Sequence, residues 1–100
     1  MKKIELNNNF FDIVKWNLVK YFGYQDRDID DIITDFKNSN MKKNDNFYMR
    51  YGSYHTASMI YHYDKKIDTK WNDWRDQNNY VKPPQEAIDY YNAYFTSNKY

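Results

Sequence analysis

Cysteine is absent from this chain, and glycine, proline, leucine and glutamate each occur only twice. Without cysteine, disulfides, thiolate metal sites and cysteine nucleophiles are excluded. Two glycines are too few for a glycine-rich loop that cradles phosphate. No apolar run exceeds three residues, whereas a membrane-spanning helix needs about 20. These absences predict a protein that does not cross a membrane.

A surplus of charge of one sign is missing too. Fifteen basic residues stand against 14 acidic ones, which leaves a net charge of +1. A dedicated nucleic-acid binder normally carries a clear positive excess. Two lysines follow Met1, but no continuous apolar segment of the kind found in signal peptides comes after them. We therefore expect a cytoplasmic protein.

Aromatic residues are abundant. The 100 residues contain 12 Tyr, 6 Phe and 3 Trp, so rings outnumber the leucines, valines and isoleucines together. This length corresponds to one globular domain, residues 1–100. A domain of this size leaves part of its apolar surface in water, so some rings are expected on a binding surface, where Tyr, Trp and Arg are enriched.

Apolar spacing predicts helices at both ends of the chain. Residues 7–23 carry one apolar stripe, with Ile13, Trp16 and Val19 on the opposite side, so we expect this helix to be covered on two sides. Asn8 or Asn9 is the expected N-cap, and Gly23 the stop. Residues 26–40 form the clearest amphipathic helix, and a surface loop is expected over 38–46. After two prolines, a last helix follows.

Residues 47–63 permit two interpretations. Gly52-Ser53 suits a tight hairpin turn between aromatic runs, which gives an α+β alternative. Ile60, Ile67 and Trp74 recur at seven-residue intervals, which favours a helix from about 54 to 77 with a possible break near Asp68. The favoured fold is all-α, with four to five short helices around an aromatic-rich core.

The pattern provides no catalytic or metal-binding set. His55 and His62 lack an HExxH motif or a nearby glutamate, so no metal site is expected. Ser53 and Ser58 lie close to His55, but residues so near in sequence rarely converge as a triad, and there is no GxSxG elbow. We expect neither an enzyme nor a cofactor.

Candidate contact residues fall into two groups. The first consists of aromatic residues and an arginine that we expect to anchor a partner: Trp71, Trp74, Arg75, Tyr54, Tyr61, Tyr90 and Tyr94. Trp74 also continues the core stripe of Ile60, Tyr63 and Ile67, from which Tyr54, Tyr61 and Trp71 diverge. The second group, Asp28, Asp31 and Asp35, shares one helix face and could imitate a row of phosphates.

These features favour a small non-catalytic module that binds another protein. Many Asn, Lys and Ile beside few Ala and Arg are typical of AT-rich genes, which points to a low-GC bacterium, its phages or its plasmids. The expected role is a phage or mobile-element accessory protein that inhibits a host protein such as a defence nuclease. Two alternatives remain at this stage: single-stranded nucleic-acid binding through stacked rings, and a self-associating structural subunit.

Overall fold

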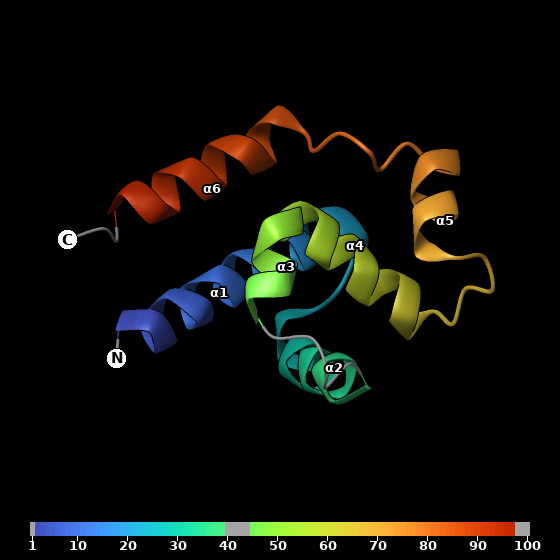
Figure 1. Ribbon diagram of the computed structural model, residues 1–100, viewed down its shortest axis with the longest axis horizontal. Coiled ribbons are helices and arrows are strands. Elements are labelled where there is room, and N and C mark those ends of the chain that lie inside the picture. The colour runs from blue at the N-terminus through green and yellow to red at the C-terminus, as the bar shows by residue number, and fades with distance from the viewer. Residues whose placement is uncertain (1, 40–44, 98–100) are drawn as a thin grey trace.

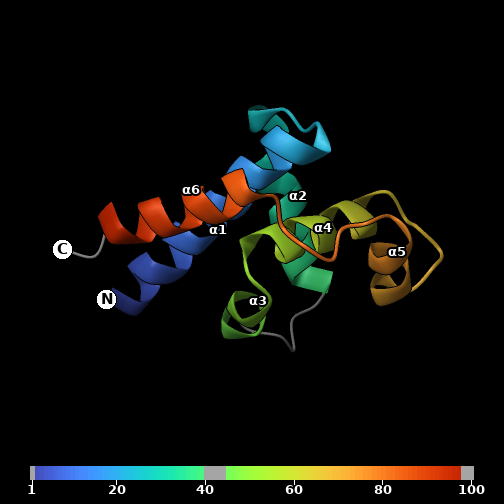
Figure 2. The same cartoon turned by 90° about the horizontal axis from the view of Figure 1, so that it is seen from above.

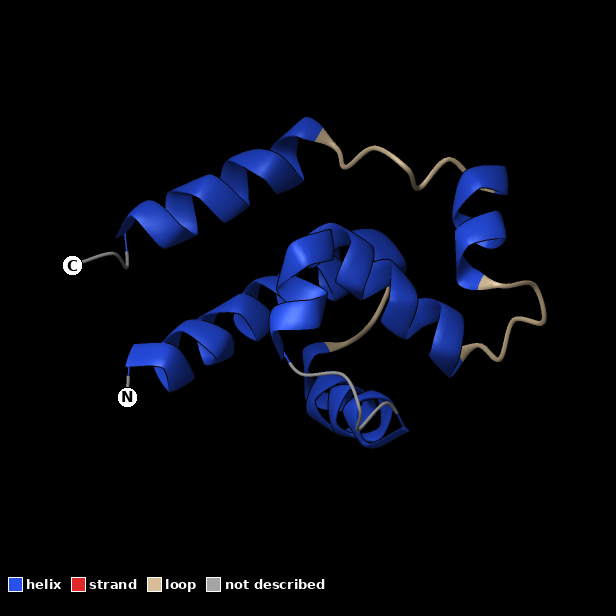
Figure 3. Ribbon diagram, in the orientation of Figure 1, coloured by secondary structure: helices blue, strands red, loops and turns tan. Residues whose placement is uncertain are grey.

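The computed structural model describes the backbone of residues 2–39 and 45–97, and the side chains within 10–39 and 47–94. This part of the chain forms six helices and no strand (Figure 3). The helices are α1 Lys2–Phe22, α2 Asp26–Ser39, α3 Asp45–Tyr51, α4 Ser53–Asp64, α5 Trp71–Gln77 and α6 Gln85–Ser97. The all-α fold class is confirmed, with one or two helices more than expected.

Helix α1 is covered on two sides, as its apolar pattern predicts. Phe10, Val14 and Leu18 are fully buried in the core, and Ile13 on the opposite side is buried as well. Trp16 stacks on Tyr90 of α6, with ring centroids 4.0 Å apart and planes 7° from parallel. Figures 1 and 2 both show α6 running alongside α1. The last helix of the chain therefore covers the second apolar side at Trp16, whereas Val19, predicted on the same side, stays 44% exposed.

The predicted start of α1 is wrong. The helix begins at Lys2 and runs through the asparagines that were expected to cap it. Good helix formers precede them in the chain, so continuing the helix costs little. The predicted stop is correct, because Gly23 takes a left-handed φ of 77° and the Tyr24 amide donates to the Leu18 carbonyl.

Helix α2 matches its pattern. Ile29, Ile33 and Phe36 are buried against the core, while aspartates occupy the first turn, where the helix dipole favours negative charge. The loop predicted over 38–46 is wrong at both ends, since α2 continues to Ser39 and α3 begins at Asp45. The remaining positions of that prediction, residues 40–44, lie outside the described part.

No hairpin forms around Gly52, because both flanking segments are helical. Gly52 has φ 90° and ψ 164°, a conformation almost restricted to glycine. Its amide donates to the Tyr48 carbonyl and the Thr56 amide donates to the Gly52 carbonyl. Thr56, Ala57 and Ser58 are buried in succession, which excludes the alternating burial of a strand. The α+β alternative is thus overturned by a single glycine that turns one helix into the next.

The helix predicted from 54 to 77 is broken into two. Helix α4 ends at Asp64, and α5 begins at Trp71 without a side-chain cap, so Asp68 does not cap it. Lys66 takes a left-handed φ of 52°. The Ile67 amide then donates to the His62 carbonyl and the Lys66 amide to the Tyr63 carbonyl, which is the Schellman pattern of a helix end. This turn positions Ile67 and Trp71 beside α4.

One core unites the helices. Helix α4 packs against α1, α2, α3 and α5, so it is central. The buried side chains of the core are Phe10, Phe11, Val14, Leu18, Phe22, Ile29, Ile33, Phe36, Tyr48, Tyr54, Ala57, Ile60, Trp74 and Ala87. Seven of these 14 are aromatic, which confirms the aromatic-rich core.

Candidate functional site: an aromatic pocket

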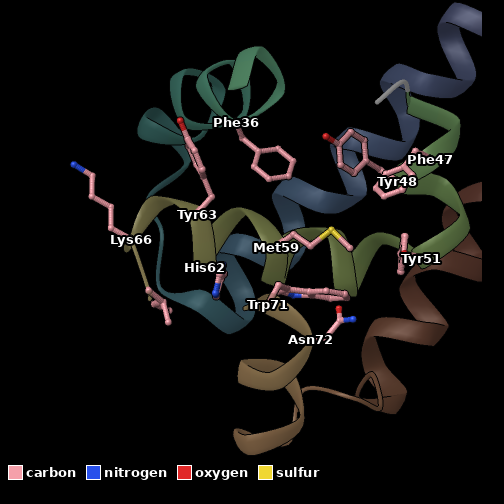
Figure 4. A pocket seen from close by; sticks show the side chains of 11 residues that line it. Phe36, Phe47, Tyr48, Tyr51, Met59, His62, Tyr63, Lys66, Trp71 and Asn72 are labelled. Atoms are coloured by element: carbon pink, nitrogen blue, oxygen red, sulfur yellow. The ribbon is translucent and has the colours of Figure 1, made fainter. Parts of the chain in front are cut away.

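An open pocket of about 580 Å³ lies between α2, α3, α4 and the start of α5 (Figure 4). We call it the ring pocket. Its lining comprises Phe36, Phe47, Tyr48, Tyr51, Met59, His62, Tyr63, Lys66, Ile67, Trp71 and Asn72. The volume falls within the range of about 300–1,000 Å³ that is common for ligand-binding clefts. The ring pocket is therefore the principal candidate site.

The six rings of the pocket contact one another in an unbroken chain. From Trp71 the chain runs to Tyr51, Phe47, Tyr48, Phe36 and Tyr63, with successive centroids 5.7, 5.2, 5.3, 5.4 and 5.7 Å apart. Tilted and edge-to-face pairs at such distances each contribute about 0.5–1.5 kcal/mol beyond their burial. The wall is thus held in shape before any ligand arrives.

Trp71 is fixed by polar contacts as well as by its neighbours in the wall. Its indole N–H donates to the Ser58 hydroxyl at 3.0 Å. The Arg75 guanidinium lies 4.8 Å from the ring centroid, a cation–π distance, and Arg75 also pairs with Asp76. The indole is half-buried, so part of it remains accessible. Trp71 and Arg75 are both predicted contact residues, and they therefore lie against each other on α5, at the edge of the pocket.

The polar groups of the ring pocket are unevenly distributed. Tyr51, Trp71 and Asn72 gather at one end, while Lys66 lies at the other with its ammonium group turned outward (Figure 4). Within the part of the chain that the structure describes, neither the Tyr51 hydroxyl nor the Asn72 amide has a hydrogen-bond partner. His62 is engaged, because its Nε2–H donates to the Thr69 carbonyl. Tyr51 and Asn72 are the donors that remain for a ligand.

One member of the predicted aspartate group, Asp35, contacts the wall of this pocket. Asp28, Asp31 and Asp35 are exposed on α2, and we call them the aspartate face. The Tyr63 hydroxyl donates to the Asp35 carboxylate at 3.1 Å. Since Tyr63 lines the ring pocket, this bond joins the aspartate face to the aromatic wall. The pocket therefore has one carboxylate, Asp35, beside it on its α2 side, and Asp31 and Asp28 continue the aspartate face along the helix away from it.

Three of the predicted contact residues lie in the core or against it. Tyr54 and Trp74 are only 7% and 8% exposed, so the prediction that Tyr54 lies off the core is wrong, and Trp74 belongs to the core stripe. Tyr61 is half-buried between Phe22 and Trp74, with centroids 5.3 and 5.8 Å away. Helix α4 is packed on several sides, which gives these rings partners that a single stripe does not reveal.

Tyr90 and Tyr94 hold α6 on α1. Tyr90 stacks on Trp16, and the Tyr94 hydroxyl donates to the Asp12 carboxylate at 3.1 Å. A surface ion pair between Lys20 and Glu86 spans the same two helices. Neither tyrosine lines the ring pocket. The structure thus separates these two residues from Trp71 and Arg75, with which they were grouped.

The burial of Tyr54 predicts a loss of stability at high pH. Removal from water, helped by Tyr80 and Tyr21, raises the pKa of Tyr54 to about 12. Below about pH 10 both folded and unfolded states keep the proton. Between about pH 10 and 12 only the unfolded state loses it, so the free energy of unfolding should fall by roughly 1.4 kcal/mol per pH unit at most from this group.

Urea denaturation at a series of pH values measures this effect. Tyr54→Phe should reduce the slope between about pH 10 and 12. Part of the slope should persist, because burial and the hydrogen bond to Asp64 raise the pKa of Tyr24 in the same direction. An unchanged slope in the Tyr54→Phe variant would contradict the assignment.

Comparison with known proteins gives no information on function. The chain matches no protein-family model, no curated protein and no solved structure. Among the described residues, no three His, Asp or Glu side chains gather as a metal site. No helix in that part of the chain is long and apolar enough to cross a bilayer.

The residues that sequence reasoning missed are the walls of the pocket. Phe36, Tyr63 and Ile67 were assigned to the core, Met59 falls on the same predicted helix face as Tyr63, and Phe47 and Asn72 were given no role. One signal was available, since five of the six rings lie between residues 47 and 71. Of the predicted contact residues, the structure brings Trp71, Arg75 and Asp35 to this site.

Proposed function

We propose that the protein is a non-catalytic module that binds another protein through the ring pocket and the aspartate face. The observation that carries this proposal is the continuous aromatic wall beside a row of exposed carboxylates. Protein interfaces typically combine a central aromatic anchor site with a polar rim. The ring pocket supplies the former and α2 the latter.

The charge of the aspartate face suggests the kind of partner. Asp28, Asp31 and Asp35 lie three and four residues apart on α2, which spaces them by about 4.5 and 6 Å along the helix axis. A basic surface complements such a row. A nucleic-acid-processing enzyme has a basic groove for its substrate, and occupying that groove would inhibit it. An inhibitor of such an enzyme is the form of the proposal that this face favours.

An affinity pull-down from a lysate of the native host tests the proposal. The wild-type chain is compared with Tyr51→Ala, which removes a ring of the pocket wall that is 41% exposed. Because Tyr51 is largely at the surface, the fold should tolerate the change. We expect wild type to retain one dominant protein and Tyr51→Ala to lose most of it.

Tyr94→Ala is the matched control, since it removes a tyrosine from the α1–α6 contact instead. This variant should retain the partner. Retention by Tyr51→Ala together with loss by Tyr94→Ala would place the contact on α6 and overturn the assignment to the ring pocket. A pull-down with no enriched protein would remove the support for a protein-binding role.

A further inference from the structure

We propose that the ring pocket binds a proline-rich segment in the polyproline II conformation, followed by basic residues that reach the aspartate face. The inference rests on the proposed function and specifies which part of the partner enters the site. It follows from three features of the pocket: the chemistry of its wall, its unused hydrogen-bond donors and the aspartate face beside it.

The wall favours proline. Proline-rich segments dock in aromatic-lined grooves, and they do so at low entropic cost because their conformation exists before binding. Six consecutive rings, with Met59 between Phe36 and Trp71 in Figure 4, provide such a groove. The other lining residues are His62, Lys66, Ile67 and Asn72. The ring faces thus offer flat apolar surfaces onto which pyrrolidine rings can pack.

The unused hydrogen-bond donors of the ring pocket favour a partner segment with an extended backbone over a helical one. The Tyr51 ring lies 5.7 Å from that of Trp71 and the Asn72 side chain lies beside Trp71 (Figure 4); neither the Tyr51 hydroxyl nor the Asn72 amide is used within the described chain. An α-helix already satisfies its own carbonyl groups, so it would leave these donors without a partner. A polyproline II segment has no internal hydrogen bonds, and its carbonyls can accept from both. Strand addition has no template, because the described residues form no sheet edge.

The position of the aspartate face determines which end of the bound segment carries the basic residues. The donors lie at the Tyr51 end of the ring pocket, and Tyr63 joins the aspartate face to the wall through Asp35. Lys66 also lines the pocket near Tyr63, but its ammonium group is turned outward (Figure 4). Prolines at the Tyr51 end and arginines or lysines beside α2 therefore complement the site.

Isothermal titration calorimetry with synthetic peptides tests this inference. The probe is a peptide of repeated Pro-Pro-Leu units that ends in arginines. We expect it to bind the full wild-type chain and to bind Tyr51→Ala at least about tenfold more weakly, as expected for the loss of an anchor ring. Asp35→Asn should weaken binding several-fold and reduce its dependence on salt. Circular dichroism checks that each variant is folded, and Asn72→Ala provides a second pocket variant with an exposed side chain.

The decisive control is the same peptide with every proline replaced by alanine, which favours a helix. This peptide should not bind detectably. Equal or tighter binding of the alanine peptide would overturn the inference in favour of a helical partner. Absence of binding by either peptide, while the pull-down still depends on Tyr51, would overturn it and leave the protein-binding role intact. If neither Tyr51→Ala nor Asn72→Ala changes the affinity for the proline peptide, the peptide binds outside the ring pocket and the inference is overturned.

Discussion

Replacing Trp74 with alanine is expected to lower the free energy of unfolding by about 3–5 kcal/mol, as for other buried aromatic residues. The indole is 8% exposed. It stacks on Tyr80 and Tyr61, with centroids 4.9 and 5.8 Å away. Removing it leaves a cavity between α4, α5 and the segment that follows α5. Urea denaturation followed by circular dichroism measures the change.

The control for this variant is Val81→Ala. Val81 is 50% exposed, so its truncation should change stability by less than about 0.5 kcal/mol. If Trp74→Ala is as stable as the wild type but loses its partner, Trp74 is a contact residue, in line with its place among the predicted partner anchors. A loss of stability of the expected size assigns it to the core.

Those parts of the fold with a simple apolar period could be predicted from the sequence. The spacing of Ile29, Ile33 and Phe36 locates both the extent and the buried face of α2. The two apolar sides of α1 predict a cover on each, and α4 and α6 provide it. A helix that packs on one side only has a single stripe of apolar residues, which is visible in the sequence. Helix α4 has four neighbours, so no single stripe describes it and Tyr54 was misplaced.

The ring pocket could not be predicted in the same way. It is assembled from four helices and a turn, and its shape depends on two backbone features. Gly52 turns α3 into α4, and Lys66 ends α4 in a conformation that glycine usually adopts. A lysine gives no sequence signal for such a turn. With α4 continued past Asp64, as predicted, Ile67 would lie on the core stripe instead of lining a pocket.

The two tryptophans of α5 illustrate the limit of pattern reasoning. Trp71 and Trp74 are three residues apart on a helix of only seven residues, so they point to neighbouring directions. The two indoles differ in burial because Trp74 packs against Tyr61 and His62, whereas Trp71 contacts Ser58 and Tyr51. Helix α4 supplies the neighbours of Trp74, and α4 and α3 together supply those of Trp71. Tertiary packing therefore decides which tryptophan is core and which is accessible.

This difference leads to an opposite expectation for Trp71. Trp71→Ala should weaken partner binding by at least about 2 kcal/mol, or roughly thirtyfold, as for an aromatic anchor. Its effect on the free energy of unfolding should be smaller than that of Trp74→Ala, at about 1–2 kcal/mol. The indole is half-buried, and Ser58 keeps its bond to the His55 carbonyl without it. Affinity for the captured partner and urea stability are measured on the same preparations.

The Trp71→Phe variant distinguishes the contribution of the aromatic ring to binding from that of its hydrogen bond. Phenylalanine keeps an aromatic surface in the wall but loses the donor to Ser58, which contributes about 1 kcal/mol. We expect affinity to lie between those of the wild type and Trp71→Ala. If Trp71→Phe binds as weakly as Trp71→Ala, the fixed orientation of the indole matters more than its area. If both variants bind like the wild type, Trp71 belongs to the scaffold of the pocket, and the contact must be carried by the rings of α3 and by Tyr63.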